Sequence, residues 1–144
     1  MNIQEEIKRQ QQSAEEKERQ RRIQHKQYVS DTRKMIPEIA EYVKTAVARR
    51  YLREGGPKGP SVQRRGFIGR KYYRTTINFD TTSTFSSEFW KKQLKWGRAL
   101  RSCPEVDREL ADAITKQGLI FKGISRNDAD ADQTKVYIFV EFDI

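Results

Sequence analysis

The chain has 144 residues, which is enough for one domain with a single hydrophobic core. It is 35% hydrophobic and 34% charged, and its net charge of +9 lies in its middle, since residues 49–101 hold 14 Lys or Arg and 3 Asp or Glu, a net +11. A single cysteine and the lack of a long apolar run exclude an internal disulfide, a multi-cysteine zinc site and a membrane span, so we expect a cytoplasmic protein without a membrane partner.

Residues 1–33 are expected to form a polar helical arm in front of a single α+β domain over residues 34–144. The segment has strong helix formers and no Gly or Pro, and Glu-to-Arg pairs four residues apart favour a helix. Up to residue 26 its sizeable apolar side chains beyond Met1 are Ile3, Ile7 and Ile23. A helix that is polar all round has little core of its own, so the arm is either simply exposed or lies on a partner.

An amphipathic helix is predicted over residues 36–53. Its apolar positions fall on one side at 100° per residue, and Pro37 can stand in a first turn or kink one longer helix. Gly55 and Gly56 end this helix, and residues 54–66 are predicted to form a long loop. Long loops in small domains are often binding elements.

A half-buried strand is predicted over residues 71–79, where apolar and polar side chains alternate. This alternation places Tyr73 with Ile77 and Phe79 toward the core. Its neighbour Tyr72 is expected on the opposite, basic face of the sheet. A shift of one residue in strand register would exchange the two tyrosines.

A helix over residues 87–101 is predicted next, with Phe85 and Ser86 as its hydrophobic staple and N-cap. One side of this helix is apolar, and the opposite side carries three lysines and an arginine. Pro104 is expected to open a further helix, which Gly118 ends as a C′ residue.

The C-terminal part of the chain has the pattern of a hairpin. Residues 119–125 and 135–144 are predicted to be strands joined by the polar connection 126–134. The last strand has bulky apolar groups on both faces, so it is expected to be central or doubly covered. The elements predict an α+β fold with a small antiparallel sheet of about three strands, packed with helices and preceded by the long polar N-terminal helix.

Motifs for catalysis or cofactor binding fail on their spacing. His25 is the only histidine and lies in the polar arm. Asp128, Asp130 and Asp132 imitate the start of an EF-hand loop, but Gln133 stands where that loop needs glycine. The stretch GGPKGPS lacks the spacing of a phosphate-binding loop, and its prolines remove backbone N–H groups. We therefore expect no enzyme activity, no cofactor and no metal.

Cations interleaved with aromatic residues form the candidate site. The stretch RRGFIGRKYYR, residues 64–74, holds five Lys or Arg and three aromatic residues. Fixed cations attract a phosphate backbone, and an aromatic ring can stack on an unpaired base. The same cations also fit an ordinary solvated surface. The predicted nucleic-acid-binding residues, on a loop-strand and a helix face, are Arg64, Arg65, Arg70, Lys71, Tyr72, Arg74, Lys91, Lys92, Lys95 and Arg98.

The pattern therefore predicts a non-enzymatic module that binds DNA or RNA, alone or inside a nucleic-acid-containing complex. The alternative is a protein-binding inhibitor or adaptor whose arm and basic face dock on an acidic protein. By analogy alone, a small phage-borne regulator of a nuclease complex, of the anti-CRISPR type, is an example. An enzyme of unfamiliar type is a third hypothesis. Nucleic-acid binding falls steeply with salt, whereas a groove-filling protein contact does not.

Overall fold

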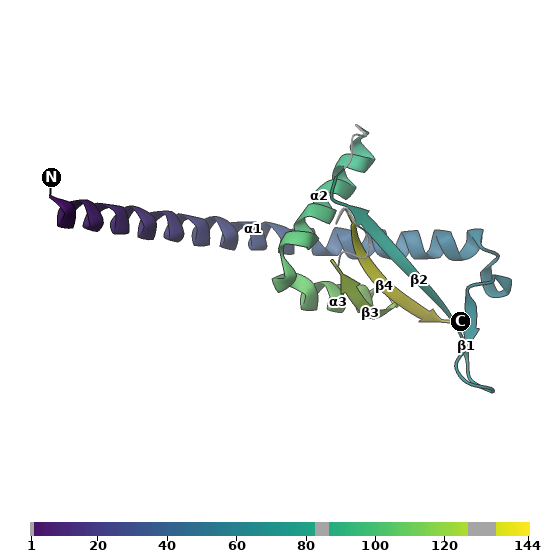
Figure 1. Ribbon diagram of the computed structural model, residues 1–144. Coiled ribbons are helices and arrows are strands. Elements are labelled where there is room, and N and C mark those ends of the chain that lie inside the picture. Colours follow the sequence, from purple (N-terminus) through teal and green to yellow (C-terminus); the bar gives the residue numbers. More distant parts are fainter. Residues whose placement is uncertain (1, 83–86, 127–134) are drawn as a thin grey trace.

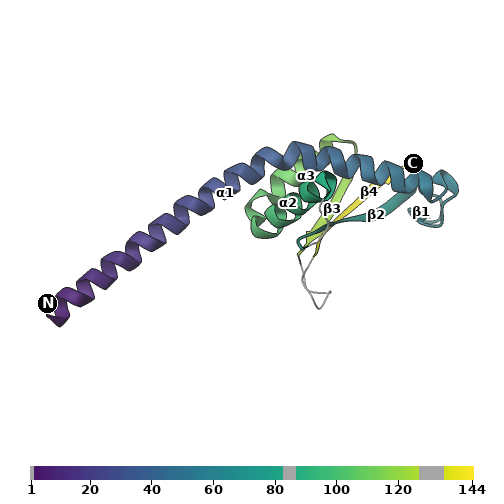
Figure 2. The same cartoon turned by 90° about the horizontal axis from the view of Figure 1, so that it is seen from above.

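The computed structural model describes residues 2–82, 87–126 and 135–144. A four-stranded antiparallel sheet, in the order β1-β2-β4-β3, has its helices on one face, and the other face is open in the described part of the chain (Figures 1 and 2). The predicted α+β class is confirmed, with one strand more than expected. The elements are α1 (Ile3–Arg53), β1 (Val62–Arg64), β2 (Lys71–Asp80), α2 (Glu88–Ser102), α3 (Asp107–Lys116), β3 (Ile120–Ser125) and β4 (Lys135–Asp143), with short 3₁₀ helices at Gly56–Lys58 and Pro104–Val106.

α1 is one helix of 51 residues that contains both of the first two predicted helices. Pro37 lies in its interior, and Figure 2 shows α1 bent where it reaches the sheet. A proline inside a helix removes one backbone hydrogen bond and presses its ring against the preceding turn, which accounts for a bend. Of the two expectations for Pro37, the structure shows the single longer helix.

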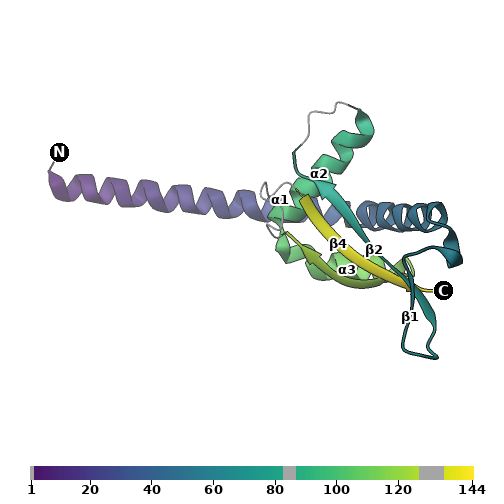
Figure 3. The same ribbon diagram turned by 45° about the vertical axis from the view of Figure 1, so that its right-hand side comes forward.

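The first part of α1 projects from the body as an exposed polar helix (Figures 1 and 3). Among the described residues, the first side chain of α1 that reaches another element through a hydrogen bond is His25, whose Nε2 lies 2.9 Å from Glu105 Oε1. Thr32 is fully buried and donates a hydrogen bond to Cys103 Sγ. Packing against the body therefore begins before residue 33, where the arm was expected to end.

β2 and β4 alternate as the sequence predicted. Tyr73 and Phe79 face the helices and are buried, whereas Arg74 faces the open side of the sheet. β4 lies between β2 and β3, and its alternate residues from Val136 to Val140 are fully buried on the helix side. On the other side Phe139 is 39% exposed. β4 is therefore central, as predicted, and helices cover only one of its faces.

α2 begins one residue later than predicted, with Ser87 as its N-cap instead of Ser86. The Ser87 hydroxyl accepts a hydrogen bond from the backbone N–H of Trp90 over 3.3 Å. Phe85 and Ser86 lie outside the described residues. Gly97 lets α2 approach the end of β2 closely, because a Cβ atom at this position would lie 2.3 Å from the carbonyl oxygen of Asp80.

β1 is the strand that the sequence did not predict. It occupies three residues of the expected long loop and pairs with the start of β2, with Gln63 opposite Tyr72. So short a segment carries no periodic pattern of its own. At the other end of the domain, Gly118 follows α3 with a φ of +89°, as predicted for a C′ glycine.

Candidate nucleic-acid interface

The predicted site residues fall into two groups at opposite ends of β2. The hairpin group, carried by β1, β2 and the turn between them, contains Arg64, Arg65, Arg70, Lys71, Tyr72 and Arg74. The α2 group contains Lys91, Lys92, Lys95 and Arg98. β2 has ten residues and therefore spans roughly 30 Å. The structure does not bring the two groups together, and each has to be judged separately (Figures 1 and 3).

Two arginines of the hairpin group are held by acidic side chains of β4. Glu141 is 1% exposed and accepts hydrogen bonds from Arg65 over 2.8 Å and from Arg74 over 3.0 Å. Arg65 also contacts Asp143, at 3.2 Å. Burial raises the pKa of Glu141, but the hydrogen bonds from the two arginines outweigh it and leave the pKa below its usual value. Arg65 and Arg74 are therefore largely neutralised and act first as structural anchors.

Tyr72 lies on the open face of the sheet, as the alternation predicted, but its ring is covered. It is 8% exposed, and the Arg65 guanidinium carbon lies 4.1 Å from its ring centroid. Its hydroxyl donates to Gln63 Oε1 over 2.7 Å. The expectation that Tyr72 offers an open stacking surface is wrong, because Arg65 already occupies the exposed side of the ring.

The turn of the hairpin instead exposes two apolar residues. Phe67 is 96% exposed and Ile68 is 91% exposed. The turn closes through a 3.0 Å hydrogen bond from the Arg65 N–H to the carbonyl oxygen of Arg70. Gly69 is required there, because a Cβ atom on it would lie 1.5 Å from the Arg65 carbonyl oxygen. Ile68 was not predicted as a site residue; two bulky apolar residues between glycines and arginines were the signal.

Two cations of the hairpin group that Glu141 does not hold line one hollow together with Lys58. Lys58, Arg64 and Lys71 line a hollow of about 330 Å³ between the 3₁₀ turn and the start of the hairpin, and no Asp or Glu is among its described lining residues. Arg70 stands on the same hairpin, and all four side chains are exposed. Within the described residues none of the four makes an ion pair. Lys58 was missed from the sequence because its place beside Lys71 depends on strand pairing.

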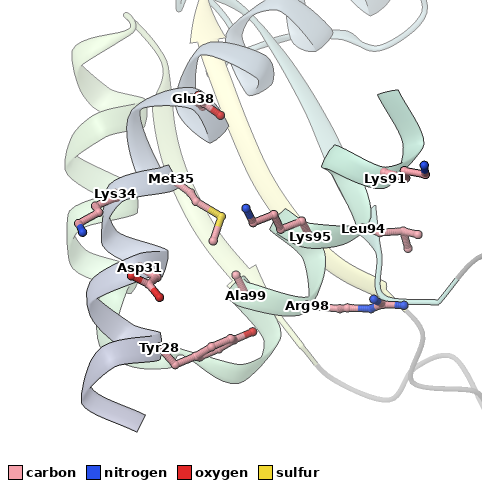
Figure 4. A pocket seen from close by; sticks show the side chains of 10 residues that line it. All are labelled: Tyr28, Asp31, Lys34, Met35, Glu38, Lys91, Leu94, Lys95, Arg98 and Ala99. Atoms are coloured by element: carbon pink, nitrogen blue, oxygen red, sulfur yellow. The ribbon is translucent and has the colours of Figure 1, made fainter. Parts of the chain in front are cut away.

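The α2 group is exposed, as predicted, but its charges are mixed with carboxylates. Lys91 lies 3.4 Å from Glu88 and Lys92 lies 3.6 Å from Glu38. Lys92 also sits 5.7 Å from the ring centroid of Trp96. A groove of about 720 Å³ separates α1 from α2, and Figure 4 shows its lining. The charged residues of that lining are Lys34, Lys91, Lys95, Arg98, Asp31 and Glu38.

Other candidate groups are accounted for by packing. His25 lies in the arm, and Glu105 holds it at the junction of the arm and the body. Cys103 is fully buried. No group of three or more His, Cys, Asp or Glu able to hold a metal occurs in the described part of the chain, and Asp128, Asp130 and Asp132 lie outside it.

No helix among the described residues is both long and apolar enough to cross a membrane.

The hollow beside the hairpin is distinguished by the charge of its lining, since cations line it without a carboxylate. No known protein family, curated protein or solved structure matches the chain.

Proposed function

We propose that the protein is a non-enzymatic nucleic-acid-binding module that contacts the phosphate backbone through its β1–β2 hairpin. The observation that carries this proposal is the hollow lined by Lys58, Arg64 and Lys71 without a carboxylate. Cations that are unpaired in the free protein can release counterions from a phosphate backbone without first breaking an ion pair. Arg70 adds a fourth exposed charge on the same hairpin.

The arrangement of the neighbouring carboxylates supports the same assignment. Glu141 and Asp143 are the acidic side chains nearest to the hairpin along β4, and both are engaged by arginines, chiefly Arg65. Their negative charge is therefore compensated and does not oppose an anion bound at the hollow. At the α2 group, by contrast, Glu38 and Glu88 stand beside the lysines.

Replacement of Lys58, Arg64 and Lys71 by Gln is expected to weaken binding to a DNA or RNA oligonucleotide strongly at low salt. Each lost phosphate contact should also reduce the slope of log K against log salt concentration by about 1, or by about 3 for the triple variant. A gel-shift titration at several salt concentrations measures both, and a thermal melt checks that the variant folds.

The matched control removes an equal charge elsewhere, by replacing Lys91, Lys92 and Lys95 with Gln. We expect the control to weaken binding less, because two of these lysines already face carboxylates. Equal losses in the two folded variants would show that binding follows net charge alone. Undiminished binding by the hairpin variant would remove the hollow from the site.

A second candidate function is supported by the arm. Ile3, Ile7 and Ile23 are 72%, 49% and 55% exposed on a helix that projects from the body (Figure 3). Burying an exposed isoleucine side chain contributes about 1.5–3 kcal/mol. The arm therefore suits a protein-binding inhibitor or adaptor that places this helix on a partner.

Deletion of residues 1–22 separates the arm from the body. We expect the shortened chain to melt within a few degrees of the full chain, because His25 makes the first hydrogen bond from α1 to the body among the described residues. For comparison, a chain that starts at Ile36 loses buried Thr32 and should melt markedly lower. A large fall in melting temperature after the shorter deletion would contradict the exposed arm. A pull-down from nuclease-treated lysate tests the arm directly. If the shortened chain no longer captures a protein that the full chain captures, but still binds nucleic acid, protein binding is assigned to the arm.

A further inference from the structure

The apolar tip of the β1–β2 hairpin is not explained by folding. Phe67 and Ile68 are 96% and 91% exposed, and neither packs against the hydrophobic core. The turn itself depends on its glycines, since Gly66 has a φ of +72° and Gly69 has no room for a Cβ atom. Two small polar residues would serve the turn equally well, so the exposed aromatic and aliphatic pair points to contact with another molecule.

The base of the hairpin holds this tip in a defined place. The Arg65 side chain contacts Glu141 at 2.8 Å and Asp143 at 3.2 Å, both on β4, and stacks on Tyr72. The Arg65 N–H also closes the turn through Arg70. Arg65 is therefore a positioning residue that ties the turn to the central strand, and Figure 3 shows the hairpin projecting from the end of the sheet. A tip held in this way loses less conformational freedom on binding.

Charge identifies the kind of surface that receives the tip. Arg64, Arg70 and Lys71 flank the two apolar residues within the same hairpin, and Lys58 stands beside its base. An apolar segment only two residues long with cations on both sides matches duplex DNA, in which a stacked base step lies between two phosphate backbones. Proteins that bend DNA insert Phe, Ile and similar side chains between base pairs from the minor groove, and basic side chains contact the flanking backbone.

We propose that Phe67 and Ile68 form a wedge that inserts between base pairs of duplex DNA from the minor groove and bends the duplex. The inference rests on the proposed function, and it adds the substrate class and the mode of contact. The cations around the hollow bind the backbone beside the insertion, and Arg65 fixes the direction of the wedge. Unstacking of the base step is offset by the additional backbone contacts that the bent duplex makes.

A double variant, Phe67→Ser with Ile68→Ser, tests the wedge while keeping both glycines and all cations. The probes are a short duplex with a fluorescence energy-transfer pair at its ends, and the same duplex with 2-aminopurine at successive A·T steps. The unaltered protein should raise energy transfer, as expected for a kink of roughly 20–90°, and should increase 2-aminopurine fluorescence at one step. The double variant should bind about tenfold or more weakly and should abolish both signals at saturating protein.

The matched control is Ile3→Ser with Ile7→Ser, which removes two exposed apolar residues from the arm and should change neither signal. DNA binding by the unaltered protein without bending, or equal bending by the tip variant, would overturn the wedge and leave the proposed function standing. Absence of DNA binding would overturn the wedge, and absence of both DNA and RNA binding would overturn the proposed function as well. Tip-dependent binding to phosphatidylserine vesicles without DNA bending would assign the tip to a lipid surface instead.

Discussion

Replacement of Tyr73 by Ala is expected to lower the free energy of unfolding by about 3–5 kcal/mol. Tyr73 is 1% exposed, and its ring centroid lies 5.1 Å from that of Tyr51 and 5.6 Å from that of Phe142. Its hydroxyl donates to Glu54 Oε2 over 2.5 Å, which ties β2 to the end of α1. The variant loses the aromatic cluster and leaves Glu54 without this donor. Urea unfolding followed by circular dichroism measures the loss.

Tyr72→Ala is the matched control, because it removes the same side chain one residue away on the other face of β2. Arg65 and Arg74, two flexible side chains that can rearrange or return to water, lie over its ring. We expect a loss of about 1–2 kcal/mol, smaller than for a site inside the packed core. Equal losses at Tyr72 and Tyr73 would contradict the assignment of one face to the core.

The raised pKa of Tyr73 makes the free energy of unfolding depend on pH. Burial raises this pKa, and the hydrogen bond to Glu54 raises it further. A phenol whose pKa is higher in the folded protein than in the unfolded chain contributes its full stability below the unfolded value, about 10. That contribution is lost as the pH rises through the folded value. Tyr73→Phe should therefore narrow the difference in stability between neutral and strongly alkaline solution.

Replacement of Glu141 by Ala is expected to lower the free energy of unfolding by about 2–3 kcal/mol. The Glu141 carboxylate lies on the face of the sheet that the helices leave open, where neighbouring side chains bury it. Its ion pairs with Arg65 and Arg74 connect the hairpin to β4 and β2. Without it, Arg74 loses its ion pair and Arg65 keeps only its contact with Asp143. The loss lies below that of a fully buried pair because both arginines reach water. Urea unfolding of the variant measures it.

The change in the free energy of unfolding from neutral to acid pH isolates the contribution of Glu141. Burial raises its pKa, but the hydrogen bonds from Arg65 and Arg74 lower it more, so the folded value lies below that of an unfolded glutamate, about 4.3. The contribution is therefore present above pH about 4 and lost as the pH falls through the folded value. Glu141→Gln should differ most from the unaltered protein at neutral pH and least in acid. Parallel stability curves from neutral to acid pH would contradict this account.

Local patterns determined most of the elements. The alternation of β2 and β4 and the apolar stripes of α2 and α3 are properties of consecutive residues, so they predicted which side chains face the core. They predicted the burial of Tyr73, but they did not predict that Tyr72 is covered as well. Gly118 ends α3 because glycine readily adopts the left-handed backbone conformation that is found there. Pro37 was ambiguous, because proline fits both a first turn and a bent helix interior, and only packing of α1 along the body selects between them.

The concentration of positive charge was likewise determined by the sequence, but the availability of each cation was not. Arg74 meets Glu141 across 67 positions of the chain, and Arg65 meets it across 76, because antiparallel pairing places β4 beside β2. β1, too short to show a pattern, exists because β2 offers it an edge, and it brings Arg64 to Lys58 and Lys71. Ion pairing acts between side chains that are close in space, so only the tertiary structure decided which cations are neutralised and which line the hollow.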